Sequence, residues 1–146
     1  MATAPLTTRP TPERIFNTLN AFQSTAALKT GFELDLFSAI AEGANQPDTL
    51  AKRVGASERG VRILADYLAI QGFLTKEGDR YSLAPETAGF LDRRSPAFMG
   101  SVIGFLASER HKQSFERLTD AVRAGGSVMP EGAEGKTRWQ SRCEGL

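Results

Sequence analysis

Residues that could carry chemistry are few in this chain, and none stands in a catalytic pattern. There is one histidine, His111, and one cysteine, Cys143. A general base or a nucleophile needs a partner that orients or activates it, and neither residue lies in a motif that supplies one. Glu33 and Asp35 form a carboxylate pair, but apolar neighbours and the lack of a histidine or metal partner favour a structural role. We therefore predict no catalytic residue and no metal site in this chain.

Two glycine-containing stretches imitate cofactor loops without meeting their requirements. DAVRAGGSV has a glycine pair, but it follows an expected helix, whereas a dinucleotide-binding loop follows a strand. GAEGKT resembles the end of a phosphate loop, yet Pro130 stands where the first glycine of that loop is needed. Neither stretch predicts a cofactor site in this chain.

Length and charge narrow the classes of protein. With 146 residues, 40% hydrophobic and 24% charged, the chain can bury one ordinary core and is short for a two-domain enzyme. A formal net charge of +1 provides no field that would attract nucleic acid or an anionic membrane. No apolar run has the length of a membrane span, and MATAPLTTRP lacks the features of a secretory signal. These features predict a cytoplasmic protein without a membrane partner.

The elements that position these residues begin after a mobile arm, which we expect over residues 1–10 because they show no hydrophobic period. Thr11 is the expected N-cap of a first helix, with Pro12 at its first position. Apolar residues then recur at helical spacing, which predicts packing either on the chain's own core or on another subunit. These residues are Ile15, Phe16, Leu19, Phe22, Ala26 and Leu28.

The middle of the chain has the pattern of a winged helix. GFELDLFSAI is apolar enough to be core or interface. PDTLAKRVG predicts a short helix that ends at Gly55, and Ser57 is the expected cap of a longer helix that ends near Gly72. FLTKEGDRYSLAP predicts a hairpin with its bend at residues 77–79. Two helices followed by a hairpin give a mainly α fold with a small two-stranded β wing.

The longer of these helices has two apolar faces and therefore needs two partners. One face carries Val61, Leu64, Ala65 and Leu68, and the other carries Ile63, Tyr67 and Ile70. A DNA-recognition helix needs an exposed polar face, but only a narrow polar stripe is left here. From Pro47 to Leu83 six cations face five anions, and so near-neutral a balance argues against duplex binding.

Two further helical segments follow the wing. A short helix ends at residues 90–91, and after a charged break at 92–94 comes a densely apolar segment, expected to be buried between layers or across a dimer. Its apolar residues are Phe98, Met99, Val102, Ile103, Phe105 and Leu106. SERHKQSFERLTDAVRAGG predicts one helix with Phe115, Leu118 and Val122 on one face, ended by Gly125 and Gly126. Residues 127–146 show no period and predict a linker or disordered tail.

Three stretches in this order resemble a known family: ALKTGFELDLFSAI, LAKRVGASERGVRILADYLAIQGFLTKEGDRYSLAPETAGFL and RLTDAVRAGG. They are similar to the N-terminal dimerisation domain of S-adenosylmethionine-dependent small-molecule O-methyltransferases, over residues 11–126. The resemblance implies a homodimer whose helical domain closes over a small aromatic or polyketide-like acceptor. It also implies a following Rossmann-like domain that binds the cofactor and holds the general base, and this chain lacks the glycine-rich loop of that domain.

The resemblance makes six apolar residues candidates for the dimer interface or the substrate lining: Phe16, Leu19, Phe22, Met99, Val102 and Ile103. Each of them could also be ordinary core. Two other functions stay open at this point. A winged-helix transcriptional regulator would bring Arg59, Arg62, Lys76 and Arg80 to DNA phosphates. A non-catalytic dimerisation module would instead pair with a full-length enzyme.

Overall fold

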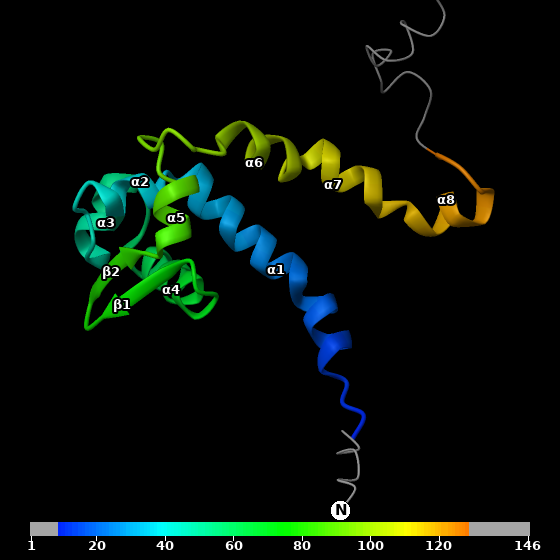
Figure 1. Ribbon diagram of the computed structural model, residues 1–146, viewed down its shortest axis with the longest axis horizontal. Helices are drawn as coiled ribbons and strands as arrows, with labels where there is room; N and C mark the ends of the chain where they lie inside the picture. The colour runs from blue at the N-terminus through cyan, green and yellow to red at the C-terminus, as the bar shows by residue number, and fades with distance from the viewer. Residues whose placement is uncertain (1–8, 129–146) are drawn as a thin grey trace, which may run out of the picture. The chain divides into compact units, whose positions relative to one another are not determined.

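A computed structural model describes residues 9–128, and Figure 1 shows its helices and strands. The chain divides into two compact units, with the boundary between Gly104 and Phe105, and each unit is described by itself. The predicted arm and tail lie almost entirely outside the described residues, as do Trp139, Cys143 and the GAEGKT stretch. Within the described residues the chain is mainly helical with one small antiparallel sheet, which confirms the predicted fold class.

The first helix, α1 (Glu13–Glu33), begins one residue later than a cap at Thr11 would place it. Pro12 occupies the N-cap position, and no side chain caps the helix. The predicted role of Thr11 as N-cap is therefore wrong. The reason is local, because Pro12 has a φ of −80° and a ψ of 7° and so stands just before the helix instead of inside it.

A sharp turn at Asp35 leads from α1 into α2 (Leu36–Ala41), the most deeply buried helix of the first unit. Asp35 has a φ of 59°, a left-handed conformation that aspartate tolerates better than most residues. Gly31 lies just before this turn, and a Cβ at that position would lie 3.0 Å from the ring of Phe37. The end of α1 therefore packs tightly on α2.

Helices α3 (Pro47–Val54) and α4 (Glu58–Ile70) have the bounds that the sequence predicts. Gly55 ends α3 in the left-handed conformation, with a φ of 70°. The Ser57 hydroxyl caps α4 by accepting a hydrogen bond from the Gly60 amide at 3.1 Å. Both helix ends were readable because their signals are local.

Strands β1 (Leu74–Glu77) and β2 (Arg80–Leu83) form the predicted hairpin, and Leu74 pairs with Leu83. A two-residue turn at Gly78 and Asp79 joins them, with a φ of 59° at the glycine. The core lies between α2, α3, α4 and the hairpin. Its large members are Leu36, Phe37, Ile40, Leu50, Val61, Leu68, Leu74 and Tyr81.

Helix α5 (Pro85–Phe90) follows the hairpin and lies beside β2 and α2 (Figure 1). Helix α6 (Gly100–Leu106) crosses the boundary between the units and has no buried residue. Burial of the segment from Phe98 to Leu106 between layers of this chain is therefore a wrong prediction. The other alternative, burial across a dimer, stays a prediction.

The second unit contains α7 (Glu109–Glu116) and α8 (Leu118–Ala124) where the sequence predicted one helix. Arg117 breaks it, with a φ of −102° and a ψ of 26°. The Arg117 side chain donates a hydrogen bond to the carbonyl of Val128 at 2.9 Å. Neither glycine nor proline marks the break, so no local signal in the sequence predicts it. The end of α8 at Gly125 is as predicted.

Candidate dimer interface

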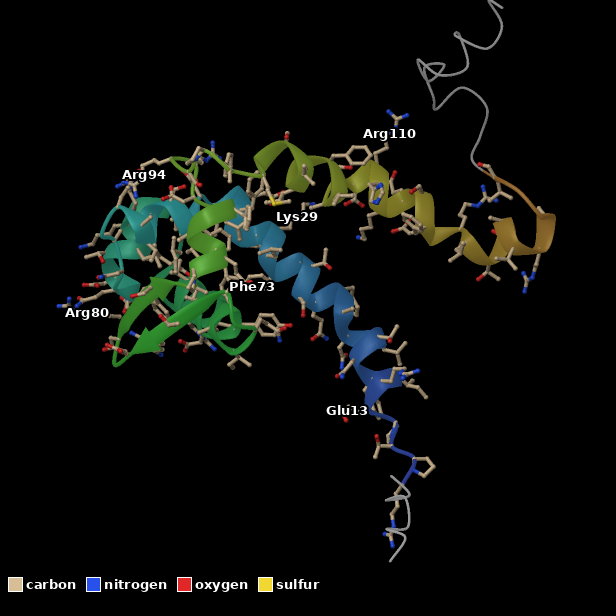
Figure 2. The ribbon with its side chains drawn as sticks, in the orientation of Figure 1. Glu13, Lys29, Phe73, Arg80, Arg94 and Arg110 are labelled. Carbon is tan, nitrogen blue, oxygen red and sulfur yellow. The ribbon has the colours of Figure 1, made fainter. Side chains whose placement is uncertain are left out.

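The first half of α1 exposes a stripe of large apolar side chains. Every residue from 9 to 23 is exposed to solvent. We define the α1 stripe as Ile15, Phe16, Leu19 and Phe22, which are between 57% and 69% exposed. Figure 2 shows side chains projecting from this part of the helix, between the labelled Glu13 and Lys29. Burying one such side chain is worth about 1.5–3 kcal/mol, so a partner surface that covered the stripe would gain several times that amount.

The second half of α1 anchors the helix to the rest of the first unit. The Ser24 hydroxyl lies 3.0 Å from the hydroxyl of Tyr67 on α4. Gly31 is buried against Phe37 of α2 and Leu68 of α4. These contacts fix α1 at one end, so the stripe extends from a well-packed support.

Helix α4 buries one of its two predicted apolar faces and leaves the other open. Val61, Ala65 and Leu68 are at most 1% exposed and belong to the core. On the other predicted face Tyr67 is half-buried against α1, but Ile63 is 60% exposed and Ile70 is 81% exposed. The sequence required two partners for this helix, and the first unit supplies one.

A shallow groove of about 360 Å³ runs along the seam between α1 and α4. We call it the α1/α4 groove, and the residues that line it are Gln23, Ala27, Gly60, Ile63, Leu64 and Tyr67. Most of the lining is carbon. Because Gly60 has no side chain, one part of the wall is formed by backbone alone.

The polar stripe of α4 is paired with neighbouring side chains. Arg62 lies 3.3 Å from a carboxylate oxygen of Glu58 and 3.6 Å from one of Asp79. Asp66 accepts hydrogen bonds from the Lys76 ammonium at 2.7 Å and from the Tyr81 hydroxyl at 2.6 Å. These pairs brace the hairpin against α4.

The same contacts set the protonation of this cluster. Hydrogen bonds from Lys76 and Tyr81 hold the pKa of Asp66 below its ordinary value. The hydrogen bond to Asp66 raises the pKa of Lys76. Burial, followed by the hydrogen bond to Asp66, raises the pKa of Tyr81. Two of the four cations that a DNA-binding function would use, Arg62 and Lys76, thus already have carboxylate partners.

The later group of candidates lies apart from the α1 stripe. Met99 and Val102 are 39% and 43% exposed, and Ile103 is half-buried. The Met99 amide donates to the carbonyl of Phe90 at 2.9 Å, which holds the start of α6 near the end of α5. The Phe98 ring stacks on Phe32, with centroids 6.3 Å apart. Phe32 lies about 15 Å along α1 from Phe22 at 1.5 Å per residue, so the six candidates form two groups.

Ion pairs hold both members of the predicted carboxylate pair. Glu33 lies 3.7 Å from the Lys29 ammonium, and Asp35 accepts from the Arg93 guanidinium at 2.7 Å. The Arg93 amide also donates to the hydroxyl of Ser38 at 3.0 Å. This arrangement is structural, and the sequence contained no signal for the role of Arg93, which lies 58 residues from Asp35.

His111 lies in the second unit, in an aromatic surrounding. Its ring lies 5.3 Å from the Phe105 ring and 5.2 Å from the Phe115 ring, centroid to centroid. Its amide donates to Ser108, the cap of α7. Over residues 9–128 there is no group of three or more histidine, cysteine or acidic side chains that could hold a metal ion. No helix in that range is both long and apolar enough to cross a membrane.

Comparison with protein families identifies the fold. The family model of the O-methyltransferase dimerisation domain matches residues 16–93, which include α1 from the stripe onward, the core and the hairpin. The chain belongs to this family. The predicted resemblance is thereby confirmed, and a DNA-binding function has no support among the comparisons.

Individual relatives of this O-methyltransferase dimerisation domain are methyltransferases. The tetracenomycin polyketide synthesis 8-O-methyl transferase of Streptomyces glaucescens is 35% identical over 82% of this chain and 35% of its own length. A crystal structure from Nostoc punctiforme, assigned as an O-methyltransferase, is 42% identical over 86% of this chain and 38% of that one, with a TM-score of 0.79. Human N-acetylserotonin methyltransferase in complex with SAM shares the fold, at 24% identity and a TM-score of 0.69, over 82% of this chain and 36% of that one. The chain spans about a third of the length of these relatives.

The described residues of the dimerisation domain do not fit S-adenosylmethionine. The strands of residues 9–128 form one antiparallel hairpin, so no glycine-rich loop there joins a parallel strand to a helix. In DAVRAGGSV, Gly125 is the C-cap of α8 and has a left-handed conformation with a φ of 74°.

Proposed function

We propose that this dimerisation domain pairs two copies of its chain through the α1 stripe, within a SAM-dependent methyltransferase. The parent reaction would transfer a methyl group from the sulfonium of the cofactor to a hydroxyl of a small aromatic or polyketide-like acceptor. The contribution of this chain would be positional, since catalysis by proximity requires the reacting groups to be held in line. The observation that carries the proposal is the exposed stripe on a helix whose other half is firmly anchored.

The supporting argument is energetic. A half-helix with no tertiary contact is marginal in water, because most helical stability in proteins comes from packing an apolar face. The α1 stripe is such a face, and no residue of the described range 9–128 covers it. A second copy supplies the missing surface, and the family model that matches residues 16–93 is described as a dimerisation domain.

The substitution Phe22→Asp, measured by light scattering at two concentrations, tests the role of α1. Asn17→Asp is a matched control, because at 100° per residue Asn17 lies roughly 140° around the helix from Phe22. Both positions are exposed. We expect a dimer for the parent chain and for Asn17→Asp, and a folded monomer for Phe22→Asp. A dimer of unchanged mass in the Phe22→Asp variant, folded by circular dichroism, would remove α1 from the interface.

The second part of the proposal is that Met99, Val102 and Ile103 line the acceptor side of the domain as part of a lid. These side chains form a small apolar group at the start of α6, held by the bond between the Met99 amide and Phe90. Apolar walls with few polar groups suit a planar aromatic ligand. An NMR titration with 1-naphthol at millimolar concentration tests this, with methyl shifts expected at these three residues. Shifts confined to other methyl groups would contradict the lid.

A further inference from the structure

Two open apolar surfaces of the first unit share one helix. The α1 stripe ends at Phe22, and the wall of the α1/α4 groove begins at the next residue, Gln23. The other wall is formed by the open face of α4 around Ile63. A stripe and a groove that adjoin on one chain can be matched by a two-fold axis, since each copy then offers both surfaces to the other.

We propose that each copy seats its α1 stripe in the α1/α4 groove of a second copy, so that the contact is stripe to groove and not stripe to stripe. This inference rests on the homodimer proposed above and specifies how it is built. The occupant of the groove is thus the segment from Ile15 to Phe22 of the partner.

The apolar area favours this pairing. The four stripe residues, together with Ile63 in the groove, expose on the order of 600 Å² in the first unit, which is most of the roughly 800 Å² per partner of a standard interface. Pairing stripe to stripe would use only the four side chains of α1 and leave the open face of α4 in water. Pairing stripe to groove covers both surfaces.

The chemistry of the α1/α4 groove also suits burial in an interface. The lining is mostly apolar, so side chains of the partner would displace water from carbon surface. The Tyr67 hydroxyl already has the Ser24 hydroxyl as a partner at 3.0 Å. Covering Tyr67 therefore leaves no unpaired polar group, which is the usual cost of burying a tyrosine.

Disulfide cross-linking between differently tagged chains tests the contact. Cys143→Ser removes the one native cysteine and gives the background. One chain then carries Leu19→Cys in the stripe and the other Ile63→Cys in the groove. A disulfide needs Cα atoms about 4.4–6.8 Å apart, so it reports direct apposition. The matched control replaces Ile63→Cys by Thr75→Cys, which is exposed on β1 outside the groove.

We expect copper phenanthroline oxidation to give at least five times more mixed disulfide for the Leu19–Ile63 pair than for the Leu19–Thr75 pair. Chains linked mainly through two copies of Leu19→Cys, with no excess at Ile63, would overturn the groove while leaving the homodimer intact. A chain that light scattering finds monomeric at every concentration would overturn both. The two failures are thus distinguishable in one set of samples.

Discussion

Two regions of the first unit place the same kinds of apolar residue in opposite surroundings: the body, which we define as helices α2 to α5 with the hairpin (residues 36–90), and the first half of α1. In the body, Phe37, Leu50 and Leu68 are fully enclosed. In α1, Phe16, Leu19 and Phe22 stand in solvent. Helical spacing marks both sets in the sequence, so spacing reveals which face is apolar but not which molecule covers it.

The difference extends to polar groups. In the body, polar side chains near the core are paired, as Asp66 is with Lys76 and Tyr81. On the first half of α1 the Thr18 hydroxyl donates back to the carbonyl of Arg14 in its own helix. The body therefore pairs most of its polar groups with one another, whereas the first half of α1 has local interactions and an apolar face that no described residue covers.

The largest expected effect separates the two regions directly. Phe37→Ala should lower the free energy of unfolding by about 3–5 kcal/mol, because it opens a cavity beneath Gly31 in a close-packed core. Phe22→Ala should instead weaken association, so that its effect on the urea midpoint grows with protein concentration. Urea denaturation at two concentrations measures both. If both variants lowered the urea midpoint equally and independently of protein concentration, Phe22 would belong to the core of the single chain.

A smaller effect compares the body with the seam between α1 and α4. Tyr81→Phe removes a hydrogen bond to a carboxylate and should cost about 1.5–3 kcal/mol. Tyr67→Phe removes a bond between two neutral hydroxyls and should cost about 0.5–1.5 kcal/mol. Urea denaturation of the two variants measures the difference. A greater loss for Tyr67→Phe would show that the hydrogen bond between Tyr67 and Ser24 is stronger than the one between Tyr81 and Asp66.

The pH dependence of the unfolding free energy at low pH tests the contacts of Asp66 that hold the hairpin against α4. The pKa of Asp66 is lowered in the folded chain, so its contribution is fully present above the unfolded value near 3.9 and is lost as pH falls through the lowered folded value. Asp66→Asn keeps an acceptor for Tyr81 but removes the charge. Its unfolding free energy should therefore fall less steeply than that of the parent below about pH 4. Denaturation series from pH 7 to pH 2 measure the slopes.

Asp92 supplies the internal reference for that experiment. Its pKa is also lowered, mainly because the Arg94 amide donates to its carboxylate. Some acid sensitivity should therefore persist in the Asp66→Asn variant. Identical acid limbs for the parent and the variant would show that the pairing with Lys76 contributes nothing measurable to folding, as is common for exposed ion pairs.

The parts of the fold that the sequence predicted are those with local signals. Pro47 and Gly55 delimit α3, Ser57 caps α4, and Gly78 turns the hairpin, each through the conformation of one or two residues. The break at Arg117 has no such signal. The pairing of Asp35 with Arg93 was equally hidden, because it depends on where α5 leads the chain.

The candidate interface was predictable to the same extent. The sequence identified the α1 stripe and the two apolar faces of α4, because both follow from helical spacing. It did not predict the α1/α4 groove, since the groove exists only where Gln23 and Ala27 cross Gly60 and Ile63. The second apolar face of α4 did indicate that this helix needs another surface to pack against. It did not indicate the shape of that surface.

The smallest expected effect concerns an exception within the body's own pattern of paired polar groups. The Thr87 side chain on α5 is 1% exposed, and its hydroxyl has no hydrogen-bond partner among the described residues. Thr87→Val keeps the branched shape and removes the unpaired hydroxyl, so it should raise the free energy of unfolding by about 1 kcal/mol. Ser38→Ala is the matched control, because it deletes a paired hydroxyl that accepts from Arg93 and should cost about as much as Thr87→Val gains. Urea denaturation measures both variants. If Thr87→Val proves destabilising, this hydroxyl has a hydrogen-bond partner in solution. Thr87 would then follow the pattern of paired polar groups in the body, which would sharpen the contrast with the exposed stripe of α1.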